Sequence, residues 1–185
     1  MEDVKNEDSA KSGGSRRRGI KLFRGAGAPG LFESGTMSTP IFDPDDQRQL
    51  AADGPRSANI AVGGHDAVLF RGDGEDGYSL VKAWFAPHYV LPRHSHDADC
   101  MYYIVEGSIS MGSQVLEAGD GFFVPAGAPY AYEAGDDGVV VLEFRMRTTF
   151  NMIIPGGQVD RWRRLAAVAA EHSGEWADLR QQVDG

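Results

Sequence analysis

Short apolar runs alternate with turn signals through the middle of the chain, and this pattern predicts β-strands. The first runs are residues 58–62, 67–71 and 78–86, and the connections between them are rich in glycine. The pattern continues with runs at 101–105, 108–111, 114–117, 122–124, 130–133 and 139–146. Roughly eight to ten short strands at such even spacing favour a β-sandwich or a β-barrel.

Near the C-terminus the pattern changes to a helical spacing. Apolar and aromatic residues recur every three or four positions, at Trp162, Leu165, Val168, Ala169, His172, Trp176 and Leu179. This spacing predicts an amphipathic helix, in which Gly174 favours a break. We expect its tryptophans to pack on the β domain or on a second subunit. A second, shorter helix is predicted after Pro44, within residues 43–53.

The first 39 residues are rich in glycine, serine and charged residues, which predicts a disordered tail. Met37 offers a second start, so we expect the fold not to need the residues before it. Basic residues cluster at positions 16–24, where a solvated tail is favoured over a phosphate-binding arm. The predicted organisation is a tail over 1–39, a β-barrel over 40–150 and a helical segment over 151–185.

Composition narrows the function classes. The chain has 185 residues, a net charge of -9 and one cysteine. One cysteine excludes an internal disulfide framework, so we expect a cytoplasmic protein. The acidic balance argues against nucleic-acid binding, and no apolar run is long enough to span a membrane.

Chemistry-bearing residues concentrate between positions 93 and 107. His94 and His96 are two residues apart, so on an extended chain both imidazoles point to one face. Cys100 and Tyr102 alternate in the run that follows, which places them together on a face. In the run 139–146, Glu143 and Arg145 also share one face, and we expect these charges to face solvent.

Two motifs in this region resemble those of the cupin superfamily. The first frame is His88, His94, His96, Cys100 and Gly107, and the second is Gly119, Pro125, Gly127, Tyr130 and Ala134. The resemblance implies an all-β jelly-roll barrel with one internal pocket, commonly dimeric. It also implies a divalent metal held by three histidines and a glutamate. Here Cys100 stands at the glutamate position and Tyr130 at the position of the third histidine.

Three interpretations of the pocket follow. In the first, His94, His96 and Cys100 hold iron, zinc or copper, with Asp97 or Asp99 as alternative oxygen ligands. The reaction class that the family suggests is then an oxygenase acting on a small organic acid or aromatic compound. In the second, no metal is needed: the histidines act as general acid and base, with a tyrosine, Tyr130 or Tyr102, as proton donor, in an isomerase, cyclase or decarboxylase. In the third, the pocket binds a ligand without turnover.

Overall fold

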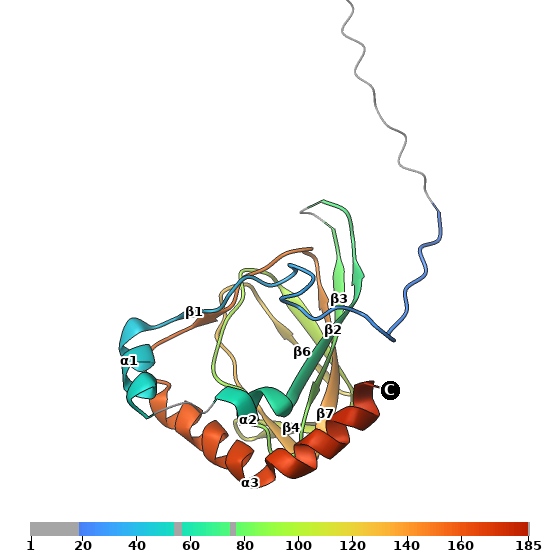
Figure 1. Cartoon of the computed structure of the whole chain (residues 1–185). Helices are drawn as coiled ribbons and strands as arrows, with labels where there is room; N and C mark the ends of the chain where they lie inside the picture. The colour runs from blue at the N-terminus through green and yellow to red at the C-terminus, as the bar shows by residue number, and fades with distance from the viewer. Residues whose placement is uncertain (1–18, 54–56, 75–76, 185) are drawn as a thin grey trace, which may run out of the picture.

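The computed structural model describes residues 19–53, 57–74 and 77–184, and its elements follow one another along the chain as Figure 1 shows. The strands are β1 (Ile41–Phe42), β2 (Gly64–Arg71), β3 (Ser79–Phe85), β4 (Cys100–Met111), β5 (Gln114–Glu117), β6 (Gly121–Val124), β7 (Glu133–Arg145) and β8 (Ile153–Ile154). The helices are α1 (Pro44–Ala52), α2 (Ser57–Val62) and α3 (Val159–Asp184).

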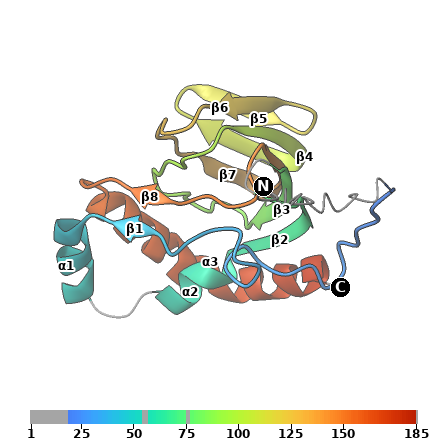
Figure 2. The same ribbon diagram turned by 90° about the horizontal axis from the view of Figure 1, so that it is seen from above.

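One antiparallel sheet carries the fold. Its strand order is β2-β3-β7-β4-β5, and β6 also pairs with β4. The sheet does not close on itself; the parallel pair β1 and β8 and the long helix α3 lie across its open side (Figure 2). This arrangement confirms the predicted all-β jelly-roll fold with a C-terminal helix.

Several predicted strands join into longer ones, and one predicted strand is wrong. Runs 101–105 and 108–111 belong to the single strand β4, which ends at a tight turn around Gly112 before β5. The run 58–62 lies in helix α2 instead of a strand. A short apolar run has no periodicity that separates a strand from a buried helical turn. Here the α2 carbonyl of Ala61 accepts a hydrogen bond from Arg180 of α3, at 2.8 Å.

The two predicted helices form, and they are connected through one buried carboxylate. Asp43 caps α1, because its side chain accepts hydrogen bonds from the backbone N–H groups of residues 45 and 46. Asp46 in turn accepts from the N–H groups of Gly157 and Gln158, just before α3 begins. Negative charge at that end stabilises the α3 dipole. The expected break at Gly174 is absent, since α3 continues through it.

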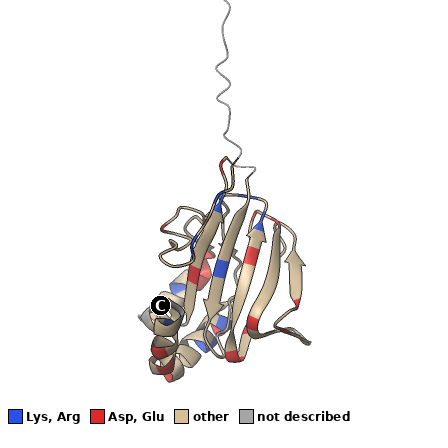
Figure 3. Ribbon diagram, turned by 90° about the vertical axis from the view of Figure 1, so that its right-hand side faces the viewer, with Lys and Arg blue, Asp and Glu red and all other residues tan. Residues whose placement is uncertain are grey.

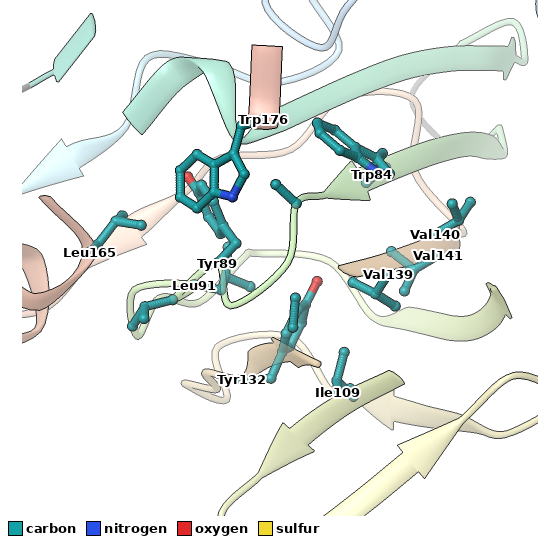
Figure 4. Close-up of a cluster of buried hydrophobic side chains, with 14 of the residues drawn as sticks. Trp84, Tyr89, Leu91, Ile109, Tyr132, Val139, Val140, Val141, Leu165 and Trp176 are labelled. Carbon is teal, nitrogen blue, oxygen red and sulfur yellow. The ribbon is translucent and has the colours of Figure 1, made fainter. Parts of the chain in front are cut away.

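The core lies between the sheet and α3 (Figure 4). Trp176 is fully buried there, its indole N–H donates to the carbonyl of Pro87 at 3.1 Å, and its ring lies 5.7 Å from that of Tyr89. The core role predicted for Trp176 is therefore confirmed. No helix in the described part of the chain is long and apolar enough to cross a membrane.

The N-terminal segment requires a correction. Residues 1–18, with most of the basic cluster, lie outside the described residues, but Leu31, Thr36 and Met37 are buried. Met37 forms a parallel bridge with Phe150, and the N–H of Leu31 donates to the Asp66 side chain. The prediction of a disordered tail through residue 39 is therefore wrong for this part. The polar average composition of residues 1–39 hid the ordered part, because only a few apolar residues are needed to cover the cavity.

Candidate functional site

A cavity of about 370 Å³ lies on the inner side of the sheet. Strands β2, β3 and β7 form one wall, and the N-terminal segment around Leu31 and Met37 forms another. Residues of β8 and Trp162 of α3 close the remaining sides. A volume of this size accommodates a small organic molecule. The predicted histidines His94 and His96 both line this cavity.

The strand register decides which side chains point inward. In β4 the predicted alternation is confirmed, because Cys100, Tyr102 and Ile104 are buried and the residues between them are exposed. In β7 the expectation is wrong: Glu143 and Arg145 are buried, whereas their neighbours Phe144 and Met146 are exposed. Glu143 is paired with Tyr102 in register, so the charged face of β7 is the inner one.

Arg145 is the resident cation of the cavity, and its side chain is 1% exposed. It donates to Glu143 at 2.6 Å and to the hydroxyl of Tyr102 at 3.0 Å. Its guanidinium carbon lies 4.0 Å from the centre of the Phe150 ring, a cation–π contact. Among the described residues no acceptor bonds its Nε atom. These contacts explain how the Glu143–Arg145 pair is stabilised on the inner face of the sheet, although charged side chains generally prefer solvent.

Both histidines are held as neutral imidazoles with a defined tautomer. Nδ1 of His94 lies 2.8 Å from the carbonyl oxygen of Pro92, and Nδ1 of His96 lies 2.5 Å from that of Asn151. A carbonyl only accepts, so each Nδ1 carries the proton and each Nε2 keeps a lone pair. Burial lowers the pKa of His94, and burial with the charge of Arg145 lowers the pKa of His96 to about 3.

The tyrosines complete a hydrogen-bond chain of fixed direction. Nε2 of His94 accepts from the hydroxyl of Tyr130 at 2.9 Å, so the Tyr130 oxygen must accept from Tyr102, at 2.5 Å. Tyr102 in turn accepts from Arg145. The protons therefore point from Arg145 through Tyr102 and Tyr130 to His94. Burial raises the pKa values of both phenols well above their usual value, so each keeps its proton in the resting site.

Cys100, like Tyr102, is a predicted site residue that does not line the cavity. Its side chain is buried on the inner face of β4, but it is not part of the cavity wall. Its Sγ approaches the carbonyl of Met101 at 3.7 Å, and burial raises the pKa of the thiol to about 12. In the chain without a bound metal, the thiol is therefore protonated at neutral pH. Asp97 and Asp99 instead bond backbone N–H groups of neighbouring loops.

The donor set fits a divalent metal only in part. The histidine tautomers are those of metal ligands, with Nε2 available and Nδ1–H held by a carbonyl. Nothing else fits: the Tyr130 hydroxyl occupies Nε2 of His94, and Arg145 places a positive charge beside His96. In the described part of the chain, no three His, Cys, Asp or Glu side chains come together as a ligand set. Metal ligation by His94, His96 and Cys100 stays a prediction that these residues do not favour.

Sequence reasoning missed one inward carboxyl group, Asp66. It lies on β2, in register with Ala83, and its Oδ1 accepts from the N–H of Leu31 at 2.5 Å. Burial is the main cause that raises its pKa. The preceding residues Gly63 and Gly64 suggest a turn, and this conceals the start of β2 from sequence analysis. No alternation of apolar and polar residues marks this strand, and its register shifts between Val68 and Phe70, so the sequence offers no local signal for Asp66.

The motif frame itself is present in the backbone. Gly107, Gly119 and Gly127 have φ angles of 74°, 99° and 78°, which favour glycine. His88, which replaces the first glycine of the cupin motif, has a φ of 61°, an uncommon value for a residue with a Cβ. The backbone at His88 therefore has the positive φ that glycine adopts most easily, although the residue is not glycine.

Comparison with known proteins agrees with this frame. The chain is 32% identical over 111 residues to germin-like protein subfamily T member 2 of Arabidopsis thaliana, a match that covers 54% of this chain and 48% of that protein. The chain thus spans about half the length of this relative. No family model matches the chain.

Two solved structures show partial similarity. One is an RmlC-like cupin from Shewanella frigidimarina NCIMB 400, with 26% identity, a TM-score of 0.39, and coverage of 45% of this chain and 75% of that one. Another is the polyketide cyclase RemF from Streptomyces resistomycificus, with 18% identity, a TM-score of 0.45, and coverage of 58% and 83%. The two motifs, the jelly-roll sheet and the germin-like match together indicate a cupin-type domain.

Proposed function

We propose that the chain is a small-molecule enzyme that moves protons without a metal, as an isomerase, cyclase or decarboxylase does. The observation that carries the proposal is the directed chain of hydrogen bonds from Arg145 to His94 at the wall of the cavity. A phenol next to an unprotonated imidazole, with a third group that orients the imidazole, is a recurrent arrangement for base activation. The oxygenase alternative requires a metal, and the donor set does not favour one.

Tyr130 and His94 act together in this mechanism. The Tyr130 oxygen takes a proton from the substrate while its own proton passes to Nε2 of His94, 2.9 Å away. The carbonyl of Pro92 then stabilises the imidazolium through Nδ1–H. Tyr102 donates to the Tyr130 oxygen throughout, and Arg145 polarises Tyr102, so negative charge that develops on Tyr130 is stabilised. The same steps in reverse return the proton to a different atom of the substrate.

His96 has a separate part. Its Nε2 faces the cavity wall without a hydrogen bond from another described residue, so it accepts a donor group of the substrate. Because the pKa of His96 is about 3, it remains an acceptor at every physiological pH. We therefore assign proton transfer to Tyr130 and substrate orientation to His96.

The test is deuterium uptake by a carbon acid that enters the cavity. The protein is incubated in D₂O with 4-phenyl-2-butanone and related aryl ketones, and proton NMR follows loss of the α-proton signal. We expect catalysed exchange that falls at least ~100-fold in Tyr130→Phe and less in Tyr102→Phe. Exchange at the buffer rate for all ketones shown to bind would overturn the proposal, as would full activity in Tyr130→Phe.

We also propose that the chain forms a homodimer through the outer face of the sheet. Met101 of β4 lies in register between Phe123 of β6 and Phe144 of β7, and these three residues are 58%, 58% and 40% exposed. In Figure 3 most positions of these strands are uncharged, and the charged residues are scattered among them. Apolar surface that continues across three strands is typical of an interface. Two copies with a net charge of -9 each meet with least repulsion on such a face.

Light scattering coupled to size exclusion tests the dimer. Met101→Lys should convert it to a monomer, because the substitution buries a charge at the centre of the interface. Ile41→Lys is the matched control, since Ile41 is similarly exposed, at 57%, but lies on β1. A wild-type monomer at micromolar concentration would contradict the proposal. A cytoplasmic location is supported by the single cysteine alone.

A further inference from the structure

We propose that the cavity takes an organic cation, an ammonium group on an apolar or aromatic body, and that Asp66 is its counter-ion. The inference rests on the proposed function, because it names the substrate class of the same cavity. It starts from the charges on the cavity wall. Asp66 and Glu143 are the two carboxyl groups among the lining residues, and Arg145 is the one Lys or Arg side chain there. Arg145 is bonded to Glu143, so no Lys or Arg side chain of the cavity wall forms an ion pair with Asp66.

Asp66 offers a free oxygen to the cavity. Its Oδ1 accepts from Leu31, and no other described residue donates a hydrogen bond to Oδ2. The charges of His65 and Arg180 act on Asp66 and lower its pKa, whereas burial and Glu143 raise it. Arg180 donates to the carbonyls of Ala61 and Gly64, which line the cavity, but Arg180 is not itself a lining residue. The carboxylate is thus held in place but not neutralised by a bonded cation within the cavity.

Several other polar atoms of the wall are acceptors, whereas Arg145 Nε and Trp162 Nε1 are donors without a partner among the described residues. Nε2 of His96, which is 7% exposed, has a lone pair and no bonded donor among the described residues. Oε1 of Glu143 has no hydrogen bond from the described residues either. The phenolic proton of Tyr130 is committed to His94. A ligand that bonds to Asp66, His96 and Glu143 must therefore bring hydrogen-bond donors, as an ammonium group does.

Aromatic rings stand next to Asp66. Phe85 lies two positions after Ala83, the register partner of Asp66, so both face the cavity. The rings of Tyr89 and Tyr132 lie 5.1 Å and 5.9 Å from that of Phe85. Aromatic faces attract cations and also pack against apolar groups. A carboxylate beside a group of rings is suited to an ammonium ion and unfavourable for a carboxylate ligand.

Three probes of nearly equal size test the inference by titration calorimetry at pH 7: phenethylammonium, 2-phenylethanol and phenylacetate. We expect the ammonium probe to bind at least ~10-fold tighter than the alcohol, and phenylacetate to bind weakest. In Asp66→Asn, whose side-chain oxygen can still accept from Leu31, the ammonium preference should disappear while alcohol binding is unchanged. Asp137→Asn, at an exposed position on β7, is the control for loss of one negative charge and should keep the preference.

Equal affinity for the ammonium and the alcohol, or tightest binding of phenylacetate, would overturn the inference. So would an ammonium preference that persists in Asp66→Asn, since the charge would then lie elsewhere. Failure of the proposed function has a different signature. Ammonium-selective binding with no proton exchange on any bound ketone leaves the cation site standing and removes the catalysis. Exchange without ammonium preference removes the cation site and leaves the catalysis.

Discussion

Replacing Arg145 by methionine should destabilise the protein more than any surface substitution. The Arg145 side chain is 1% exposed and that of its partner Glu143 is 10% exposed, with 2.6 Å between them. Without the guanidinium, Glu143 is a buried charge without a partner, and breaking such a pair costs about 3–5 kcal/mol. The hydroxyl of Tyr102 also loses a charged donor, which contributes about 1 kcal/mol or more. We expect a loss of about 4 kcal/mol in the free energy of unfolding.

The assay is urea unfolding at pH 7, followed by tryptophan fluorescence and linear extrapolation. The double variant Glu143→Leu with Arg145→Met removes both charges, so it should be more stable than Arg145→Met alone by about 2 kcal/mol or more. Arg147→Met, two residues along and exposed, is the control and should change stability by less than about 0.5 kcal/mol. If Arg145→Met costs no more than the control, or the double variant is the least stable, the buried pair is refuted.

Three further predictions concern stability. The pKa of His96 is about 3 in the folded protein and near 6.5 in the unfolded chain, so the unfolded chain takes up a proton first as the pH falls. Protonation of His96 alone should therefore lower the free energy of unfolding by about 2 kcal/mol between pH 7 and pH 5. Urea unfolding of the wild type should show this loss, and His96→Gln should not. His88→Gly should relieve about 1 kcal/mol of backbone strain and so raise the melting temperature. An unchanged or lower melting temperature in calorimetry would contradict this. A chain that starts at Met37 lacks the buried Leu31, so its free energy of unfolding should be lower by about 2 kcal/mol. Leu31→Ala should lower the temperature of thermal unfolding as well. If the truncated chain is as stable as the whole one, the prediction that the fold does not need these residues is correct.

The sequence predicted the sheet and the helix because both have a clear local pattern. The strands were marked by short apolar runs between turn signals, such as residues 101–105, and Trp162 to Leu179 keep a helical spacing along α3. The inward direction of His94 and His96 followed from the motif frame. These predictions depend on residues that are close to one another in the sequence.

What the sequence did not reveal depends on contacts between distant segments. Glu143 and Arg145 look like a solvent-facing pair until Tyr102 and Phe150 are seen beside them. Asp66 becomes a cavity residue only because β2 pairs with β3 and Leu31 covers it. Burial of a charge is favoured only where its partners converge, and no periodicity encodes that convergence.

The central claim is that the cavity works through its own protons and charges. Elemental analysis by plasma mass spectrometry, on protein purified without chelators or an affinity tag, tests it most directly. The account predicts iron, zinc and copper far below one atom per chain, and no recovery of bound metal after incubation with these ions. About one atom per chain that disappears in the His94→Ala, His96→Ala double variant would contradict the account and restore the metal site.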